Sequence, residues 1–342
     1  MSATDTHMRR EINQIPDVVE QLLTHGAAAI SNAAEEIRTR NPRYFLSVAR
    51  GSSDHAATFL KYAGELLLKR PMASAGPSIN SVFGVTLDCT DALCLSISQS
   101  GQSPDIVSLS SSFASAGAHT VAITNSPTSR LARASHVTLP IHAGEEQSVA
   151  ATKTFVTSMV AGLWLLAELA RDDALLAAIR ALPEQLKDAT RCEWHEVIEV
   201  GNAHSLFTLG RGPSLAISNE AALKFKETCQ LHAESYSSAE VLHGPVAIVD
   251  PGFPVIAFSA HDATEKSLAE VADTLTERGA RVFTTSRFAQ HAVHLPIVAT
   301  DHWLTDPISI VTTFYNMVET MANNRGLNPD APRHLRKITE TT

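Results

Sequence analysis

A repeat runs through this sequence and limits what it can fold into. Three landmarks beside short apolar runs recur further along the chain, in the same order and at nearly constant spacing. They are Arg50-Gly51 and Arg211-Gly212, Ser98 and Ser259, and Gly117 and Gly279, at offsets of 161, 161 and 162 residues. We therefore interpret the chain as a duplicated unit. In each copy, strands alternate with helices, which predicts two tandem, doubly wound parallel sheets of the α/β class.

The repeat also sets the expected domain organisation. Residues 1–30 are expected to form an N-terminal helical segment, with one entry helix over 6–26 running through Pro16, because apolar residues recur there at helical spacing. A first domain is expected over 31–188 and a second over 189–325. The tail, 326–342, has no helical or strand period, which by itself is typical of a disordered terminus.

Composition excludes several kinds of partner. The chain has 342 residues, of which 44% are hydrophobic and 18% charged, enough for two α/β domains. Its formal net charge of -9 and its lack of a long Lys/Arg run argue against nucleic acid or an anionic membrane as a partner. The N-terminus has no apolar signal region, and the uncharged stretch 154–167 is too short to span a bilayer, so we expect a buried helix there. A soluble, cytoplasmic protein is expected.

The cysteines agree with a reducing compartment. Cys89, Cys94, Cys192 and Cys229 form no CxxC pair and sit mostly in apolar surroundings. The sequence therefore implies neither a disulfide framework nor a zinc site. No metal or organic cofactor is expected.

The richest chemistry lies in residues 220–245, EAALKFKETCQLHAESYSSAEVLHGP. At 3.6 residues per turn, Glu220, Lys224 and Glu227 share one stripe of a helix that is expected to begin near Pro213. A lysine one turn from a carboxylate can hold it ionised, and an ionised glutamate in a cleft is a candidate base. Spacing alone favours a simpler interpretation, a solvated helix face with an ordinary ion pair.

A second candidate site lies in the first copy of the repeat. A predicted strand, 92–97, runs into Ser98-Gln99-Ser100-Gly101-Gln102-Ser103, and a helix is predicted from Pro104. Hydroxyls and backbone N–H groups at a helix N-terminus can hold a phosphate without a single lysine. Ser52 and Ser53, after the first strand, can cap a helix or face a ligand in the same way. By composition alone, an ordinary turn-rich loop is an equal alternative. In the second copy the loop contains His261-Asp262, so only the first copy is expected to hold phosphate.

These stretches resemble the sugar-isomerase (SIS) family, and in particular the isomerase half of the glucosamine-6-phosphate synthases. Residues 220–245 are similar to its ALKxKE...HAEayxxxExxHGP signature and the loop 98–103 to its SQSGET loop. The resemblance implies that Glu227 moves a proton between two sugar carbons and that His243 assists ring opening. It implies that Lys224 keeps Glu227 ionised, and that the loop binds the sugar's phosphate through Ser98, Gln99, Ser100 and Ser103.

Two further segments carry the resemblance. Residues 144–155 are similar to GxEIGVASTKaF, which implies that Val149 and Ala151 line the sugar pocket, largely through backbone. Gln147-Ser148 stand in the Ile-Gly positions and Ala151 stands in the serine position, which leaves the hydroxyl contacts open. The tail resembles DxDxPRNLAKSVT, which implies that it folds over the active site and presents Lys337, although His334 and Arg336 depart from the pattern.

The resemblance implies a phosphosugar isomerase. Because no glutaminase half precedes the matched region in this sequence, we expect the deaminating direction, from glucosamine 6-phosphate and water to fructose 6-phosphate and ammonia. Two alternatives stay open. One is a related activity on fructosamine 6-phosphate or galactosamine 6-phosphate, and the other is a non-catalytic sugar-phosphate sensor. A homodimer with shared active sites is implied, since in the synthases the histidine loop reaches the neighbouring subunit.

Overall fold

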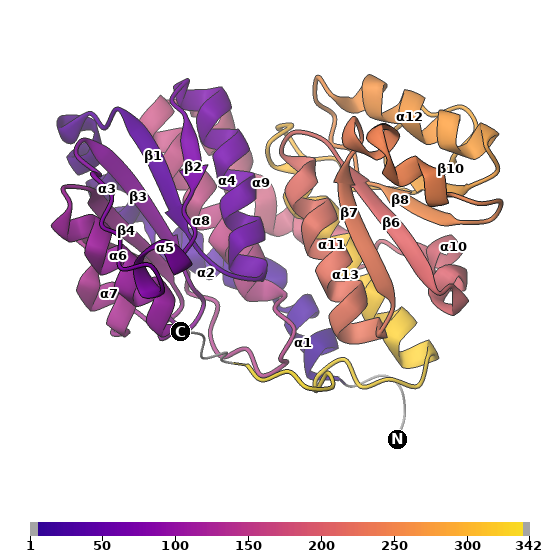
Figure 1. Ribbon diagram of the computed structural model, residues 1–342, viewed down its shortest axis with the longest axis horizontal. Coiled ribbons are helices and arrows are strands. Elements are labelled where there is room, and N and C mark those ends of the chain that lie inside the picture. Colours follow the sequence, from indigo (N-terminus) through magenta and orange to yellow (C-terminus); the bar gives the residue numbers. More distant parts are fainter. Residues whose placement is uncertain (1–5, 338–342) are drawn as a thin grey trace. The chain divides into compact units, whose positions relative to one another are not determined.

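A computed structural model of the chain describes residues 6–337. Contacts divide these residues into two compact units, each built from separate stretches of sequence. Unit 1 comprises residues 6–16, 147–152 and 181–335, and unit 2 comprises residues 17–146, 153–180 and 336–337. Each unit contains one five-stranded parallel sheet flanked by helices (Figure 1).

The sheet of unit 2 has the strand order β2-β1-β3-β4-β5, and all neighbours are parallel. The strands are β1 (Tyr44–Val48), β2 (Met72–Ser74), β3 (Ala92–Ile97), β4 (His119–Thr124) and β5 (Val137–Pro140). The helices are α2 (Ile15–His25), α3 (Ala27–Arg40), α4 (Ser52–Leu68), α5 (Ser78–Ser81), α6 (Pro104–Ser115), α7 (Arg130–Ala134) and α8 (Lys153–Ala170). From β1 the chain passes through α4 to β2, at one edge of the sheet. From β3 it passes through α6 to β4, in the direction of the opposite edge. Right-handed crossovers therefore put α4 and α6 on opposite faces of the sheet.

The sheet of unit 1 repeats this arrangement, with the order β10-β9-β8-β6-β7. Its strands are β6 (Ser205–Gly210), β7 (His232–Ser237), β8 (Pro254–Ala257), β9 (Arg281–Thr284) and β10 (Val293–His294). Its helices include α1 (His7–Asn13), α10 (His195–Ile198), α11 (Ser214–Cys229), α12 (Glu265–Glu277) and α13 (Asp306–Asn324), and α9 (Asp173–Ala189) begins in unit 2 and ends in unit 1. Short 3-10 turns complete it: η1 (Glu199–Asn202), η2 (Glu240–His243) and η3 (Pro245–Ile248). The duplication of a doubly wound parallel unit is thus confirmed.

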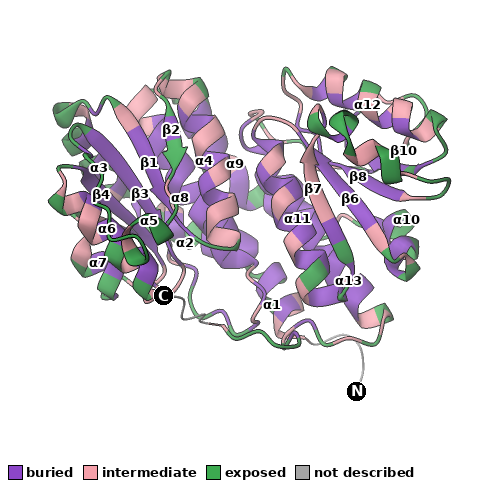
Figure 2. Cartoon of the chain, in the orientation of Figure 1, coloured by how far each residue is buried: buried purple, intermediate pink, exposed green. Residues whose placement is uncertain are grey.

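Each sheet is buried at its centre (Figure 2). All six residues of β3 and of β4 are buried, as are all four of β8. In unit 2, Val48, Cys94 and Ala122 on the sheet pack with Leu109 and Phe113 of α6 in one cluster. Burial along the whole length of a strand is typical of parallel sheets that are covered on both faces.

The single entry helix predicted over 6–26 is wrong. The chain forms α1, which ends at Asn13, and then starts again as α2 at Ile15. Pro16 explains the break, because a continuous helix would need a Pro16 N–H to donate to the carbonyl of Ile12 and would bring the ring against that carbonyl. A proline is tolerated in the first turn of α2.

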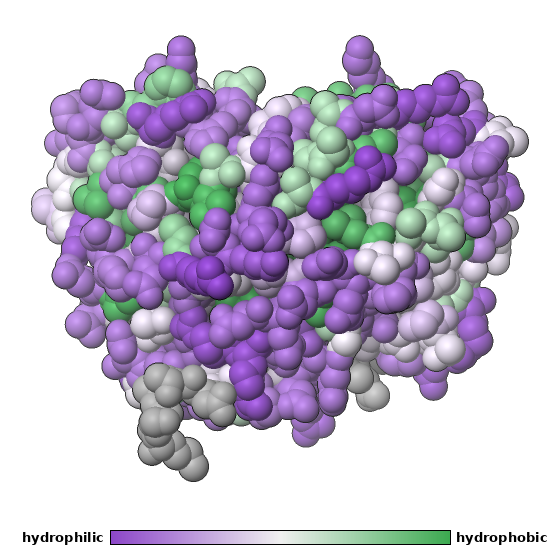
Figure 3. Space-filling view, turned by 180° about the vertical axis from the view of Figure 1, so that it is seen from behind, coloured by the Kyte–Doolittle hydropathy of each residue, from purple (hydrophilic) through white to green (hydrophobic). Residues whose placement is uncertain are grey.

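Helix α8 is the one helix, among the described residues, that is long and apolar enough to cross a membrane. How much of α8 is buried inside the protein distinguishes a core helix from a helix that spans a membrane. Of its 18-residue window, 83% is buried inside the protein, as expected for the core helix predicted there. On the face drawn in Figure 3, hydrophobic residues form separate small groups among hydrophilic ones.

Candidate active site

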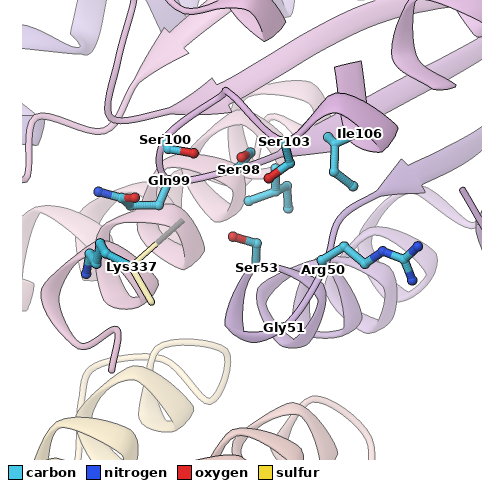
Figure 4. A pocket seen from close by; sticks show the side chains of 10 residues that line it. Arg50, Gly51, Ser53, Ser98, Gln99, Ser100, Ser103, Ile106 and Lys337 are labelled. Atoms are coloured by element: carbon cyan, nitrogen blue, oxygen red, sulfur yellow. The ribbon is translucent and has the colours of Figure 1, made fainter. Parts of the chain in front are cut away.

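A pocket of about 330 Å³ opens in unit 2 at the carboxyl ends of β1 and β3 (Figure 4). The strand order reverses between these two strands, and ligands of open α/β sheets bind at such a switch point. Ten residues line the pocket: Arg50, Gly51, Ser53, Ile97, Ser98, Gln99, Ser100, Ser103, Ile106 and Lys337. Five of the predicted substrate-binding residues thus come together there, and Ser52 is not among the lining residues.

Hydroxyl groups and helix ends give this pocket its chemistry. Ser53, Ser98 and Ser103 project into it in Figure 4. Ser103 is the N-cap of α6, yet its side chain makes no capping hydrogen bond. Ser53 lies in the first turn of α4, so the N-termini of two helices converge on one cavity. Their free N–H groups and positive dipole ends favour an anion.

The loop between β3 and α6 is held in shape by its own side chains. Ser98 Oγ accepts a hydrogen bond from Gly101 N at 3.1 Å, and Ser100 Oγ accepts one from Gln102 N at 3.3 Å. Gly101 has a φ of +61°, and a Cβ there would lie 2.2 Å from Ser129 Oγ. Only glycine fits this turn, so the position of the serine hydroxyls depends on it.

Two cationic side chains, those of Arg50 and Lys337, also line the pocket. Lys337 Nζ lies 2.6 Å from Glu146 Oε2, and the Glu146 carboxylate is wholly buried. Glu146 in turn accepts hydrogen bonds from Thr154 N and Thr154 Oγ1, in the first turn of α8. The Arg50 guanidinium turns away from the serines in Figure 4, and its Nε donates to Asp105 at 3.0 Å.

The tail that carries Lys337 is not the disordered terminus that its composition suggested. Its residues up to 337 make defined contacts. The backbone carbonyl of Asp330 accepts a hydrogen bond from Val149 N at 3.1 Å, within unit 1. Lys337, within unit 2, reaches the same cavity as the serine loop.

The matching loop in the second copy is occupied by carboxylates of the protein itself. Asp306, almost completely buried, accepts from His261 N at 3.1 Å and lies 3.3 Å from His261 Nδ1. Glu265, also buried, accepts from Arg287 N at 3.1 Å. Anionic groups placed here would repel a phosphate, which supports the prediction that only the first copy binds one.

A cluster of charged side chains lies on α11 in unit 1. Lys224 Nζ is 3.3 Å from Glu220 Oε1 and also donates to Glu227 Oε2. Tyr315, from α13, donates its hydroxyl to Glu220 Oε1 at 3.0 Å. The Glu220 and Lys224 side chains have no exposed surface, and that of Glu227 is 18% exposed. The solvated helix face that spacing alone favoured is therefore wrong.

Charge pairing sets the protonation of the lysine. Burial by itself would lower the pKa of Lys224, but the carboxylates of Glu220 and Glu227 outweigh it and raise the pKa. Lys224 is thus a permanent ammonium that holds two carboxylates. Glu227 is the only member of the trio with exposed surface, so it is the one that a ligand can reach.

The other predicted site residues of unit 1 lie on connecting segments. His243 ends η2 and is exposed, while Val241, two residues earlier, is buried and anchors the turn. Val149 and Ala151 lie in the segment 147–152 and are each partly buried. Among residues 6–337, no group of three or more His, Cys, Asp or Glu side chains is placed to hold a metal.

Sequence reasoning missed several contributors. Gly51 and Arg50 line the pocket, although the sequence indicated them only as a repeated landmark. Ile97 and Ile106 line it as apolar walls, which their place in regular elements does not reveal. Tyr315 comes from a long apolar run and has no motif of its own, so no local signal could have linked it to Glu220.

Comparison with known proteins identifies the family of the chain. The SIS domain profile matches residues 40–168 and 199–323, so both copies of the repeat are recognised. The chain belongs to the SIS domain family, as its sequence motifs predicted.

Several relatives carry names that describe sugar phosphates. The chain is 31% identical, over 96% of its length, to the glutamine–fructose-6-phosphate aminotransferase (isomerizing) of Sulfolobus acidocaldarius, and covers 56% of that protein. It is 34% identical to that of Pyrobaculum aerophilum, covering 85% of this chain and 50% of that protein. The chain thus spans about half the length of these curated relatives.

Solved structures share the fold over nearly the whole chain. A crystal structure from Silicibacter pomeroyi DSS-3, provisionally named a phosphosugar isomerase, has a TM-score of 0.93 and 56% identity, covering 95% of this chain and 100% of that one. The glucosamine-6-phosphate deaminase of Thermotoga maritima has a TM-score of 0.79 and 21% identity, covering 98% and 100% of the two chains. At that identity the second likeness concerns the fold alone.

Proposed function

We propose that the protein is a phosphosugar isomerase that converts glucosamine 6-phosphate and water to fructose 6-phosphate and ammonia. The observation that carries the proposal is the cavity at the switch point of unit 2, where serine hydroxyls, two helix N-termini and Lys337 surround one space. Such a space suits a phosphorylated ligand of sugar size, which supports the proposal. The names of the relatives, which join fructose 6-phosphate to amino-group transfer, support an amino sugar.

The proposed reaction begins with opening of the pyranose ring, assisted by His243. Glu227 then takes the proton from C2 of the open-chain aldehyde and returns it to C1, while a proton of the C2 amine passes to the C1 oxygen, which becomes a hydroxyl. This leaves an imine at C2, and water hydrolyses the imine to the ketone and ammonia. Lys224 positions Glu227, and the phosphate held by the serine loop orients the sugar, so that remote binding energy supports proton transfer.

Three substrates separate this proposal from its alternatives. Ammonia release should be fastest from glucosamine 6-phosphate, slower from galactosamine 6-phosphate, and slowest for fructosamine 6-phosphate. Gln147 and Ser148 depart from the family pattern, so galactosamine 6-phosphate and fructosamine 6-phosphate are included as alternative substrates. Turnover of none of them, together with binding of glucosamine 6-phosphate, would identify a sensor and contradict the proposed activity.

The phosphate assignment predicts an effect on substrate affinity. Replacing Ser100 and Ser103 together with alanine should raise KM for glucosamine 6-phosphate at least tenfold, since a hydrogen bond to a charged group contributes about 1.5–3 kcal/mol. The measurement is steady-state kinetics of ammonia release. Ser259→Ala, the matching change in the second copy, is the control and should leave KM within about twofold. Equal weakening by both changes would mean that the chain does not have a single phosphate site.

We also propose that the protein forms a homodimer in which the histidine loop completes the partner's site. Two features support this. His243 is exposed in the single chain. The uncharged stretch 71–87 presents large apolar side chains to solvent, with Val82 66% and Phe83 74% exposed, as surfaces that pair with a second copy do.

Mixed dimers test the shared site. Glu227→Gln and His243→Asn, each nearly inactive, would be unfolded and refolded together. A mixed dimer then has one site with both groups intact and one with neither. Since about half of randomly paired dimers are mixed, roughly a quarter of wild-type activity should return. Activity no higher than that of the separate variants would mean that each site is built within one chain.

A cytoplasmic location completes the proposal. The four cysteines are free, and three of them, Cys89, Cys94 and Cys229, are buried. Free buried thiols suit a reducing compartment.

A further inference from the structure

A buried carboxylate holds one of the residues that line the phosphate pocket. Lys337 lines the pocket, and its Nζ donates to Glu146 Oε2 at 2.6 Å. The Glu146 side chain has no exposed surface, whereas that of Lys337 is 26% exposed. Both residues belong to unit 2, as does the serine loop, 98–103. The ion pair therefore ties a residue of the pocket to the buried interior of the same unit.

Helix α8 fixes Glu146 in turn. Thr154, in the first turn of α8, donates from its backbone N to Oε1 at 3.1 Å and from its Oγ1 to Oε2 at 2.7 Å. A carboxylate removed from water is costly unless hydrogen bonds compensate it, and the positive dipole end of a helix favours an anion. These contacts hold the carboxylate in one place, so the lysine that pairs with it is held in one place as well.

A lysine in a sugar-phosphate site can act in two ways. As an ammonium it attracts the phosphate, and as a neutral amine it attacks a carbonyl carbon and forms an imine. Lysines of the second kind are made reactive by an apolar pocket or by another cation nearby. Lys337 instead pairs with an anion and is partly exposed. An ammonium paired in this way has no lone pair with which to attack a carbonyl.

We infer that Glu146 is a positioning residue that holds Lys337 at the wall of the phosphate pocket as a charged ammonium, which acts on the phosphate of the sugar and not on its carbonyl carbon. The inference rests on the proposed function and deepens it, because it gives Lys337 an electrostatic role and assigns its control to a residue that does not line the pocket. It also fits the proposed hydrolysis, since release of ammonia from the imine at C2 needs water and no amine of the protein.

Binding of inorganic phosphate, followed by phosphorus NMR, tests the role of Glu146 without turnover. Lys337→Met should raise the Kd for phosphate about tenfold, because it removes one charge-assisted contact. Glu146→Gln should raise the Kd about fivefold, since a neutral amide holds the ammonium less firmly. Both changes together should be no worse than Lys337→Met alone, because Glu146 then has nothing to position. Glu145→Gln, the same change at the exposed neighbouring position, is the control and should leave the Kd unchanged.

Direct repulsion between Glu146 and the phosphate makes the opposite prediction. Glu146→Gln would then lower the Kd, whether or not Lys337 is present. A lower or unchanged Kd in Glu146→Gln, or a further loss in the double variant, would overturn the positioning role. If Glu146→Gln does not fold, Glu146→Asp takes its place in the cycle. It keeps the charge, withdraws the carboxylate by one carbon–carbon bond, and should give the same pattern.

Lys337→Arg separates charge from nucleophilic attack. A guanidinium keeps the charge but forms no imine with a sugar, so kcat and KM for glucosamine 6-phosphate should stay within about threefold of the wild type. Lys337→Met should raise KM about tenfold. Fructose 6-phosphate with cyanoborohydride, which reduces an imine to a stable amine, should leave Lys337 unmodified in the mass spectrum of the wild type. A reduced adduct on Lys337, or equal loss of activity in both variants, would overturn the electrostatic role.

Failure of the proposed function would give a different result. If the wild type binds phosphate and shows the coupling between Glu146 and Lys337 but releases no ammonia, the inference holds and the deaminating activity is wrong. If the wild type does not bind phosphate, the assignment of the pocket is wrong and the inference is overturned with it.

Discussion

Replacing Glu227 with glutamine should lower turnover of glucosamine 6-phosphate by roughly 10²- to 10⁴-fold, the usual contribution of a positioned general base. An amide oxygen can still accept a hydrogen bond from Lys224, so the cluster on α11 should persist. An amide cannot take the proton from C2. The loss should therefore appear in kcat, with KM nearly unchanged, because the phosphate contacts in unit 2 are untouched.

The experiment needs two companion measurements. Glu277→Gln, at an exposed position on α12, should retain full activity. Thermal unfolding of Glu227→Gln should resemble that of the wild type, which would separate lost chemistry from lost structure. Activity of Glu227→Gln within threefold of the wild type would remove this residue from the mechanism.

The largest stability effect is expected from Lys224→Met. The change removes an ammonium with no exposed surface and leaves Glu220, equally buried, without its cation. Breaking a buried pair in this way costs about 3–5 kcal/mol, because an uncompensated charge stays inside. Urea unfolding followed by tryptophan fluorescence can measure it, since Trp194 and Trp303 both lie in unit 1.

Two variants make this prediction specific. Lys226→Met, two residues away on the exposed side of α11, should cost less than about 1 kcal/mol. Glu220→Gln combined with Lys224→Met should recover part of the loss, because the amide stays hydrogen-bonded to Tyr315 and carries no charge. If Lys224→Met is as stable as Lys226→Met, the cluster does not stabilise the unit.

The duplicated fold and the serine loop could be predicted from the sequence, because the repeat is periodic and the loop is a local motif. Strand-turn-helix patterns around Gly51 and Gly101 place serines at helix N-termini whatever the rest of the fold does. The resemblance then indicated Glu227 and Lys337. Their assigned roles stay predictions, as do those of His243, Val149 and Ala151.

What sequence could not show depends on contacts between distant segments. The stripe of Glu220, Lys224 and Glu227 has the same spacing whether it faces water or packs beside Tyr315, which is 95 residues from Glu220. Spacing therefore favoured the commoner, solvated case. Glu11, whose carboxylate accepts hydrogen bonds from Gln147 N and Ser148 N, did carry a signal: together with Met8 and Ile12 it forms the buried stripe of α1. An acid on such a stripe indicates a buried partner.

The interleaving of the two units has a consequence for synthesis. Most of unit 2 leaves the ribosome as one run, so its sheet can pair while translation continues. Helix α1 is made before unit 2, yet the Asp330 that accepts from its His7 N–H is 323 residues away. That contact can form only after residue 330 has been made. Neither unit can be obtained by cutting the chain at one point, and long-range closure of this kind slows folding.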